Sequence, residues 1–305
     1  MQTFQTETCL RHDLRFSPDG RRLMIGSGWP VLFDTHGTEP PVTLKPLGGR
    51  FAVHARFALG GSALVYAADG HVHDGHVHVW DFATGHERVR KHAGPNIRGL
   101  AVDPGGAVVY ETHITPDAFS WRTEVRAFDV ATGEPRGRFP AHEGAFAGPI
   151  VSADGRRLAG CGSWSACVWD LTAPDAPESA VVEVRAGKLG THLDGIALSA
   201  DGTWLATINH RGLTLWDVSG ASASEVFRSG KHRRRVSAVA CGPTRPVLAT
   251  GDTAGQVFLW DHTGRVLNRY DWGLSEVYAL CFAPDGLRCA VADGKGKIVV
   301  WDLDA

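Results

Sequence analysis

No apolar run in this chain of 305 residues approaches the roughly 20 residues that a helix needs to cross a membrane. The first ten residues lack both the basic start and the apolar core of a secretory signal. Charge of one sign is also lacking, since 31 Lys and Arg residues face 33 Asp and Glu residues and the net charge is -2. This near-balance argues against a protein that coats nucleic acid or an anionic membrane. These absences predict a cytoplasmic protein that contacts no membrane and is not built to bind nucleic acid.

Cysteine is sparse, and its spacing indicates no metal or redox motif. The six cysteines include no CxxC pair and stand at positions 9, 161, 167, 241, 281 and 289. Cys161 with Cys167, and Cys281 with Cys289, flank tight turns, so either pair could approach across a hairpin. We interpret the six as small buried hydrophobes in a reducing compartment, and we expect no zinc site.

Catalytic signatures are missing as well. The chain has no nucleophile elbow, zinc-protease motif, phosphate-binding loop or dinucleotide fingerprint in the context that each requires. Its many Asp, His and Ser residues are types that turns use for structure. We therefore expect a protein that is not an enzyme and that carries no cofactor.

The chain does contain a sevenfold repeat. Seven short segments end in an apolar residue, then Trp or Phe, then Asp, and their aspartates stand at positions 34, 81, 129, 170, 217, 261 and 302. The gaps between them run from 41 to 48 residues. A period of roughly 40–45 residues that closes on Trp-Asp is typical of a β-propeller array. Because the repeat fills the chain, we expect one domain over residues 1–305.

A turn signature recurs inside the units. It reads Ser-Pro-Asp-Gly at 17–20 and Ala-Pro-Asp-Gly at 283–286, with related sequences at 102–106, 152–155 and 199–202. Pro, Asp and Gly at these spacings favour a tight turn between strands. Alternating runs lie on both sides of each turn, as at 236–240 and 247–250, and no segment has the pattern of a long helix. Each unit thus offers an inner strand a, then strands b and c, and an outer strand d.

On these repeats the chain resembles the WD-repeat family over essentially its whole length. The resemblance implies an all-β fold, a seven-bladed β-propeller of four-stranded antiparallel blades. We expect the blades at approximately 11–47, 50–92, 96–140, 146–187, 193–228, 234–270 and 275–305. The last repeat stops after strand c, whereas residues 2–9 precede the first blade. We therefore expect residues 2–9 to supply the missing strand d and close the ring, which covers an exposed edge.

The family holds its blades with a clasp of His, Ser or Thr, Asp and Trp. The sixth unit comes closest to this set, with His232, Thr250 and Trp260. Ala254 stands where the acid is expected, and Asp252 could substitute from two residues away. No unit has all four residues at their expected positions. We therefore expect apolar packing between blades to stabilise the ring more than buried polar networks do.

Two units are longer than the others. From the a–b turn to the Trp or Phe of strand c, most units span 13–15 residues, but unit two spans 19 and unit three 22. By resemblance, b–c and d–a loops share the face that most often binds partners, so we expect longer b–c loops to build a raised rim there. The addition in unit three, residues 114–122, carries Phe119, Trp121 and Arg122, types that dominate interface energetics. The alternative is that its aromatics fold onto the neighbouring blade.

The addition in unit two is rich in histidine. His71, His73, His76 and His78 surround Asp74, and imidazoles with a carboxylate suit Zn²⁺, Ni²⁺ or Cu²⁺. Asp74 also has a structural explanation in the clasp, and surface histidines capture metal adventitiously. We expect no physiological metal, and the four histidines remain candidates for an alternative function.

Tryptophan and arginine gather on the same predicted face. Four tryptophans outside the repeat fall in its turns and loops, at positions 29, 121, 164 and 272. The run Lys-His-Arg-Arg-Arg at 231–235 lies in the d–a loop before the sixth blade, and Arg pairs bidentately with carboxylate and phosphate. The alternatives are indoles that fill gaps between blades and a solvated run of charge.

These features predict a non-catalytic scaffold that binds a protein or peptide through the loop face. The expected partner-binding residues are Phe119, Trp121, Arg122, Trp164, Arg233, Arg234 and Trp272. The aromatics of the unit-three addition would anchor the partner, and the arginines would steer it and pair with acid. The alternative is a metal- or small-ligand-binding propeller, including a catalytic one, that uses the hairpin at 71–78.

Overall fold

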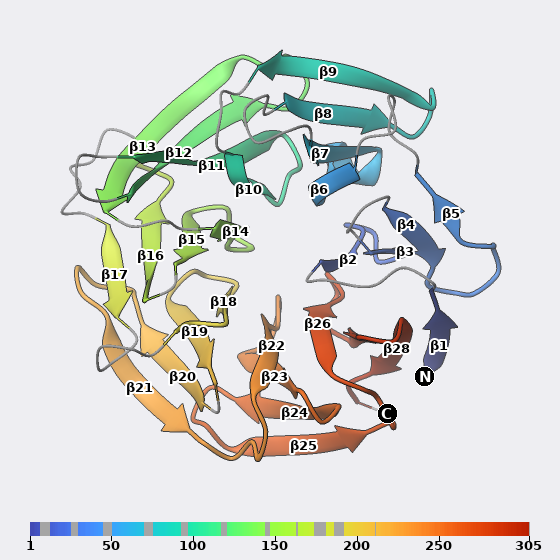
Figure 1. The fold of residues 1–305 in the computed structure, drawn as a ribbon, viewed down its shortest axis with the longest axis vertical. Coiled ribbons are helices and arrows are strands. Elements are labelled where there is room, and N and C mark those ends of the chain that lie inside the picture. Colours follow the sequence, from blue (N-terminus) through green and yellow to red (C-terminus); the bar gives the residue numbers. More distant parts are fainter. Residues whose placement is uncertain are drawn as a thin grey trace.

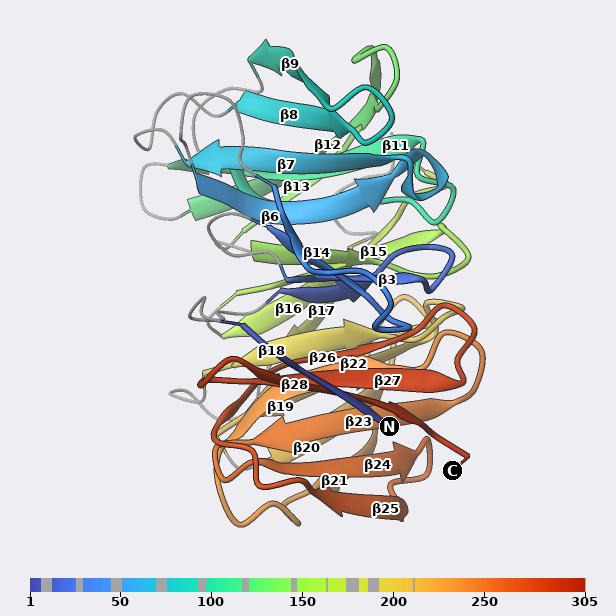
Figure 2. The same cartoon turned by 90° about the vertical axis from the view of Figure 1, so that its right-hand side faces the viewer.

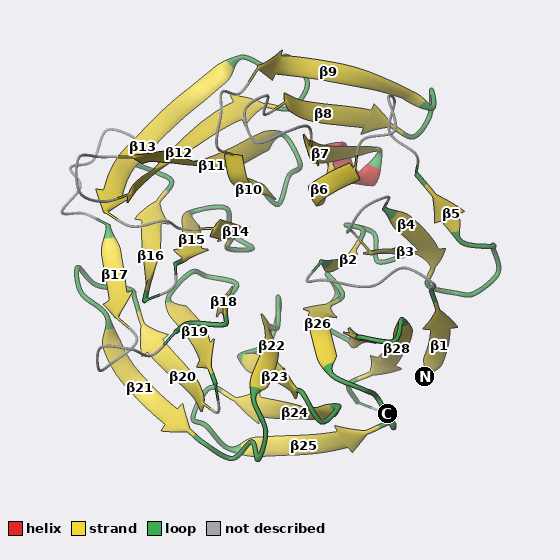
Figure 3. Ribbon diagram, viewed as in Figure 1, coloured by secondary structure: helices red, strands yellow, loops and turns green. Residues whose placement is uncertain are grey.

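The fold is a ring of β-sheets. The computed structural model describes residues 1–6, 13–25, 30–44, 51–69, 76–92, 97–116, 121–143, 147–162, 164–173, 181–185, 192–210 and 212–304. Their strands form seven four-stranded sheets, which Figure 1 shows as blades around a central axis. The part described contains one short helical turn, η2 (Leu59–Gly61). Figure 3 shows the dominance of strands and turns, and the expected all-β, seven-bladed propeller is confirmed.

The strands of a blade follow the chain from the axis to the rim. Strands a are β2 (Leu14–Phe16), β6 (Phe51–Ala58), β10 (Ile97–Val102), β14 (Ala147–Val151), β18 (Gly195–Leu198), β22 (Val236–Cys241) and β26 (Val277–Phe282). Strands b are β3 (Arg22–Ile25), β7 (Ala63–Asp69), β11 (Val108–Pro116), β15 (Arg157–Cys161), β19 (Trp204–Asn209), β23 (Val247–Asp252) and β27 (Arg288–Asp293). Strands c are β4 (Val31–Asp34), β8 (His76–Asp81), β12 (Trp121–Asp129), β16 (Ser165–Asp170), β20 (Gly212–Asp217), β24 (Gln256–Asp261) and β28 (Lys297–Asp302). Strands d are β5 (Val42–Thr43), β9 (His86–His92), β13 (Pro135–Glu143), β17 (Val182–Arg185), β21 (Ser224–Ser229), β25 (Val266–Asp271) and β1 (Gln2–Gln5).

The first strand of the chain completes the last blade. β1 pairs antiparallel with β28, with Gln2 opposite Val300 and Gln5 opposite Lys297. The ring of Phe4 lies 5.5 Å from that of Phe33 in the first blade, so β1 also contacts the neighbouring blade. The expected closure of the ring by the N-terminal strand is confirmed (Figure 1).

The core lies between the blades. Strands b are the most buried, and β23 and β27 each have one partly exposed residue followed by five buried ones. Each apolar cluster joins neighbouring blades, as where Leu248 and Trp260 of blade six pack with Ile208 and Leu213 of blade five. Burying a side chain of this kind contributes about 1.5–3 kcal/mol. The blades therefore stabilise one another face to face.

A second type of contact joins blades near the start of strand b. There a side chain reaches the segment that follows strand c of the next blade, and among the described residues this happens at five junctions between blades. The pairs are Arg22 with Phe82, Arg157 with Val218 and Ser219, Trp204 with His262, Arg245 with Asp304, and Arg288 with Thr35. These contacts tie each of those blades to the next along one face of the ring.

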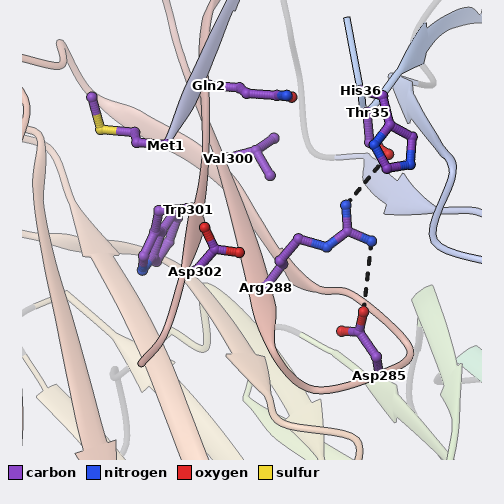
Figure 4. A pocket seen from close by; sticks show the side chains of 9 residues that line it. All are labelled: Met1, Gln2, Thr35, His36, Asp285, Arg288, Val300, Trp301 and Asp302. Carbon is purple, nitrogen blue, oxygen red and sulfur yellow. Dashed lines mark hydrogen bonds and ion pairs between the residues drawn. The ribbon is translucent and has the colours of Figure 1, made fainter. Parts of the chain in front are cut away.

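Arg288 makes this contact at the junction where the ring closes. Its guanidinium donates to the Gly20 carbonyl at 3.0 Å and to Thr35 Oγ1 at 3.4 Å, both in blade one. Asp285 of its own blade lies 3.6 Å away. A pocket of about 380 Å³ lies beside it, with Met1 on its wall (Figure 4). Blade seven is thus joined to blade one by both β1 and Arg288.

The addition in blade three lengthens its strands. β11 and β12 have nine residues each and remain paired out to Pro116 opposite Trp121. β13 accompanies β12 as far as Arg122. The β-branched residues in this stretch favour strand over loop, and pairing satisfies the backbone polar groups. The expectation of a longer b–c loop was wrong for residues 114–116 and 121–122, and Phe119 lies outside the described residues.

Candidate functional site

The turns of the blades lie on two opposite faces of the ring. Because the strands of a blade run antiparallel, the a–b and c–d turns share one face, and the b–c turns and d–a connections share the other (Figure 2). We call the second one the loop face. The described residues expected to bind a partner all belong to its turns, connections or adjoining strand ends, namely Trp121, Arg122, Trp164, Arg233, Arg234 and Trp272.

Trp121 is an exposed indole at the tip of the blade-three hairpin. It is the first residue of β12 and is 52% exposed. Because side chains alternate along a strand, Thr123 and Val125 lie on the same side of β12 as Trp121, and both are fully buried. The indole therefore extends beyond the region that the neighbouring blade covers. Arg122 is half-buried and projects to the other side of the hairpin, so the two side chains do not form one patch.

Trp164 is the second exposed indole. It lies in the b–c turn of blade four and is 54% exposed. Its ring centroid is 4.1 Å from that of His192, an exposed residue of the connection to blade five. The two rings are in contact across adjacent blades, and no sequence pattern indicated that His192 would lie there.

Trp272 has a different environment. It is half-buried in the connection between blades six and seven, stacked on Tyr270 at 4.8 Å and packed against Trp301 at 4.6 Å between centroids. Lys297 Nζ donates to its carbonyl at 2.7 Å. Its position is therefore fixed, and only part of the indole is accessible to a partner.

The basic run divides into three environments. His232 is 4% exposed, Arg233 and Arg234 are exposed, and Arg235 forms two hydrogen bonds with the Asp194 carboxylate at 2.5 and 3.3 Å. Hydrogen bonds from Arg235 join the connections on either side of blade five. Within the described residues, neither Arg233 nor Arg234 is paired with a carboxylate.

The buried histidine belongs to a complete clasp in blade six. His232 Nδ1 lies 2.9 Å from Asp252 Oδ2, and its Nε2 lies 2.7 Å from Thr250 Oγ1, which also accepts from Trp260 Nε1 at 2.7 Å. All donors are satisfied when Nδ1 donates to the carboxylate and the Thr250 hydroxyl donates to Nε2. The substitution of Asp252 for the expected acid is confirmed. Blade six does not have all four residues at their expected positions, but its clasp is complete because Asp252, at the end of strand b, still reaches the histidine.

The position of Thr250 is filled differently in other blades. Thr207 takes it in blade five, where Trp216 Nε1 donates to Thr207 Oγ1 at 3.0 Å. Val291 takes it in blade seven, and there Trp301 Nε1 is buried and has no hydrogen-bond partner among the residues that the structure describes. A buried donor left unsatisfied costs about 1–3 kcal/mol. Blade seven therefore carries a defect that blade five avoids.

Val291→Thr is expected to raise the free energy of unfolding by about 1 kcal/mol, because the new hydroxyl accepts from Trp301 Nε1. Urea unfolding followed by tryptophan fluorescence measures the change. Thr207→Val is the matched opposite, since it removes the acceptor of Trp216 and is expected to destabilise by a similar amount. If Val291→Thr proves as destabilising as Thr207→Val, the unsatisfied indole is not a source of instability.

Blades two and three bury ionisable groups at the same position. In blade two the Tyr66 hydroxyl donates to Glu87, whose carboxylate is also in ion-pair contact with His78 Nδ1. The rings of Tyr66 and His78 stack at 5.2 Å. In blade three, Glu111 and His113 interact at 3.0 Å. Burial, together with the Glu87 carboxylate, raises the pKa of Tyr66.

This network bears on the metal candidates. His78 is buried against Glu87, and the ring of half-buried His76 lies 6.3 Å from it between centroids. His71 and His73 lie outside the described residues. Among the residues that the structure does describe, no three His, Cys, Asp or Glu side chains converge as a metal site. His78 is thus committed to an internal carboxylate.

The cysteines have the chemistry of buried thiols. Those at 161, 167, 241, 281 and 289 are free, whereas Cys9 lies outside the described residues. Burial raises the pKa of Cys161, Cys241 and Cys281 to about 12. These thiols stay protonated at neutral pH, which makes them poor nucleophiles.

The repeats match a known family. The model described as "WD domain, G-beta repeat" matches residues 225–261 and 267–302. Two such repeats within a ring of seven four-stranded blades place the chain in the WD-repeat β-propeller family. In the described part of the chain, no helix is long and apolar enough to cross a membrane.

Similar proteins support the same family. The chain is 27% identical over 161 residues to Protein LST8 homolog of Drosophila melanogaster, covering 49% of this chain and 47% of that protein. It is 31% identical over 97 residues to Small ribosomal subunit protein RACK1y of Oryza sativa subsp. japonica, covering 31% and 27%. The chain thus spans less than half the length of these relatives. A chain of "Crystal Structure of Mitotic Checkpoint Complex" shares the fold, with a TM-score of 0.74, 12% identity, and coverage of 99% of this chain and 91% of that one.

Proposed function

We propose that this propeller is a non-catalytic, cytoplasmic scaffold that binds a protein or peptide through its loop face. The observation that carries the proposal is the pair of exposed indoles, Trp121 and Trp164, on the b–c side of adjacent blades. Exposed tryptophan is costly in water and is enriched where interfaces concentrate their energy. Two such residues on one face favour a partner that covers them.

The other expected residues have supporting roles in this proposal. Phe119 stands two residues before Trp121 in the sequence and joins it as an anchor. Arg122, Arg233 and Arg234 pair with acidic groups of the partner, and the accessible part of Trp272 borders the surface. Flexible basic side chains at a rim act mainly on association rate and specificity, so the indoles carry most of the affinity.

The names of similar proteins agree with a role in assemblies. One relative is named as a small ribosomal subunit protein, and the structural neighbour belongs to a mitotic checkpoint complex. Both names refer to multi-component particles. This likeness supports a protein partner in general and does not identify one.

Affinity capture from the native cell extract tests the proposal. Wild type is compared with Trp121→Ser/Trp164→Ser, which removes both exposed indoles and leaves the buried core unchanged. We expect a partner that wild type retains and the variant loses by at least tenfold in recovered amount, because truncating a central interface tryptophan costs about 2 kcal/mol or more.

Leu287→Ser is the matched control, since Leu287 is 49% exposed in an a–b turn on the opposite face. It should retain the partner. Loss with the control and retention with the loop-face variant would place binding on the other face and contradict the proposal. Thermal unfolding of all three proteins verifies that each is folded.

A further inference from the structure

Two buried aspartates hold the loop face rigid over blades six and seven. Asp252 accepts from His232 in one d–a connection, and from the amides of Ala254 and Gln256 in the following b–c turn at 2.9 and 3.1 Å. Asp293 repeats this in blade seven, accepting from the amide and hydroxyl of Ser275 and from two turn amides. Each aspartate thereby ties the connection before its blade to the b–c turn of that blade, and these two tied pairs are the frame of this surface.

Four cationic side chains belong to a connection and a turn of this frame. Arg233 and Arg234 follow the clasp histidine in sequence, and Lys231 precedes it with Nζ 5.7 Å from the centroid of the Trp260 ring. Lys295 lies in the b–c turn whose amides Asp293 holds. All four are exposed. Because the backbone beneath them is fixed, little conformational entropy is lost there when a partner binds.

Four carboxylates near these cations are engaged within the described part of the protein, and a fifth, half-buried Glu276, interacts electrostatically with Arg235. Asp194 is held by Arg235. Asp271 accepts from the Gln256 side chain at 2.6 Å and from the Gly273 amide at 3.2 Å. Asp252 and Asp293 are buried and turned to their own loops. Within the described chain the four cations therefore have no carboxylate partners, and the surface keeps an excess of positive charge.

Arg235 shows how this surface receives an acid. Its Nε and Nη2 donate to the two oxygens of Asp194, the bidentate arrangement that makes arginine selective for carboxylates. Arg233 and Arg234 precede it in the same connection and leave the same donors open to solvent. An aspartate or glutamate from another chain can be bound in the same way.

We propose that the loop face of blades six and seven is a docking surface for an acidic peptide segment, rich in Asp and Glu, of a protein partner. Lys231, Arg233, Arg234 and Lys295 bind its carboxylates, and Trp272 in the connection between the two blades borders it. The inference rests on the proposed scaffold function and supplies the chemistry of the partner. Cations spread over two blades suit an extended chain, whereas a nearly neutral protein with one basic sector is poorly matched to nucleic acid.

Fluorescence anisotropy with labelled peptides tests the docking surface. The probe is a 12-residue peptide of alternating Glu and Gly or Ser, and its matched control has Gln in place of every Glu. At low salt we expect the Glu peptide to bind wild type at least tenfold more tightly than the Gln peptide, with affinity that falls as salt is added. Arg233→Glu/Arg234→Glu should weaken binding of the Glu peptide by tenfold or more.

Arg21→Glu/Arg156→Glu is the charge-matched control, because both arginines are exposed in a–b turns on the opposite face. It should change binding by less than twofold. Equal weakening by both double variants, or equal binding of the Glu and Gln peptides, would overturn the docking surface. Tighter binding of a single-stranded oligonucleotide than of the Glu peptide would overturn it as well. The affinity capture that depends on Trp121 and Trp164 is a separate measurement. It can therefore support the scaffold function even where the peptide experiment contradicts the docking surface.

Discussion

Deletion of residues 1–6 is expected to abolish the cooperative unfolding of the propeller and to cause aggregation. These residues contain β1, the outer strand of blade seven, which pairs with β28 from Gln2 to Gln5. Without it, β28 becomes an unpaired edge in which three buried aliphatic residues and a buried tryptophan stand between half-buried Lys297 and exposed Asp302. Such an apolar edge is a template for pairing with another chain. Thermal melts followed by circular dichroism, with light scattering, measure both effects.

A graded variant separates the strand from its side chains. Phe4→Ala keeps the backbone pairing but removes the ring that contacts Phe33, so it should cost about 1–3 kcal/mol while unfolding remains cooperative. Thr3→Ala, at an exposed position of the same strand, is the control and should cost less than about 0.5 kcal/mol. A deletion variant that melts like wild type would show that Arg288 and the apolar cluster of blades one and seven suffice to close the ring.

The architecture could be predicted because each repeat specifies the same local structure. In blade one, Ser17 donates to Asp19, and Gly20 adopts a φ of 69°, which only glycine adopts at low cost. These are properties of neighbouring residues, and so they can be read from the sequence. The seventh repeat lacked an outer strand, and residues 2–9 had no blade of their own. Pairing these residues with the seventh blade is the arrangement that covers every edge.

The long contacts could not be predicted in the same way. The clasp depends on how far Asp252 reaches across a turn to His232, and its sequence distance from the tryptophan differs from the expected one. In blade three, added residues became paired strand, because cross-strand pairing depends on β13 as much as on the hairpin itself. Both outcomes are decided by segments that are distant in the sequence.

The candidate site also combines features that the sequence predicts with features that depend on contacts in the folded ring. Trp164 lies in the turn expected from the sequence, and Trp121 is exposed although it begins a strand instead of lying in a loop. The stacking of Trp272 on Tyr270 and Trp301 requires three elements to meet. Lys295 has no distinguishing pattern in the sequence, because it is one lysine in a short turn. Only in the folded blade does Lys295 lie in the turn that Asp293 holds, where it adds a cation to the proposed docking surface.

Asp252→Ala is expected to destabilise the protein by about 3–5 kcal/mol at neutral pH, because it breaks a buried network and leaves several partners without an acceptor. The carboxylate is 2% exposed, and it accepts from His232 and from two backbone amides. Asp302→Ala, at an exposed aspartate that ends a Trp-Asp segment, is the control and should lie within about 0.5 kcal/mol of wild type. A double-mutant cycle with His232→Ala isolates the histidine bond, with an expected coupling of about 1–3 kcal/mol.

The same substitution should also change the response to acid. Burial by itself raises the pKa of Asp252, but hydrogen bonds from His232 and the two amides outweigh it and leave the pKa below its usual 3.8. A carboxyl whose pKa is lower in the folded state adds stability above its unfolded pKa and loses it as pH falls through the folded value. The difference between wild type and Asp252→Ala, measured by urea unfolding, should therefore be largest at pH 7 and shrink below about pH 4. A difference that stays constant down to pH 2.5 would mean that the aspartate acts through packing alone, with its charge contributing nothing.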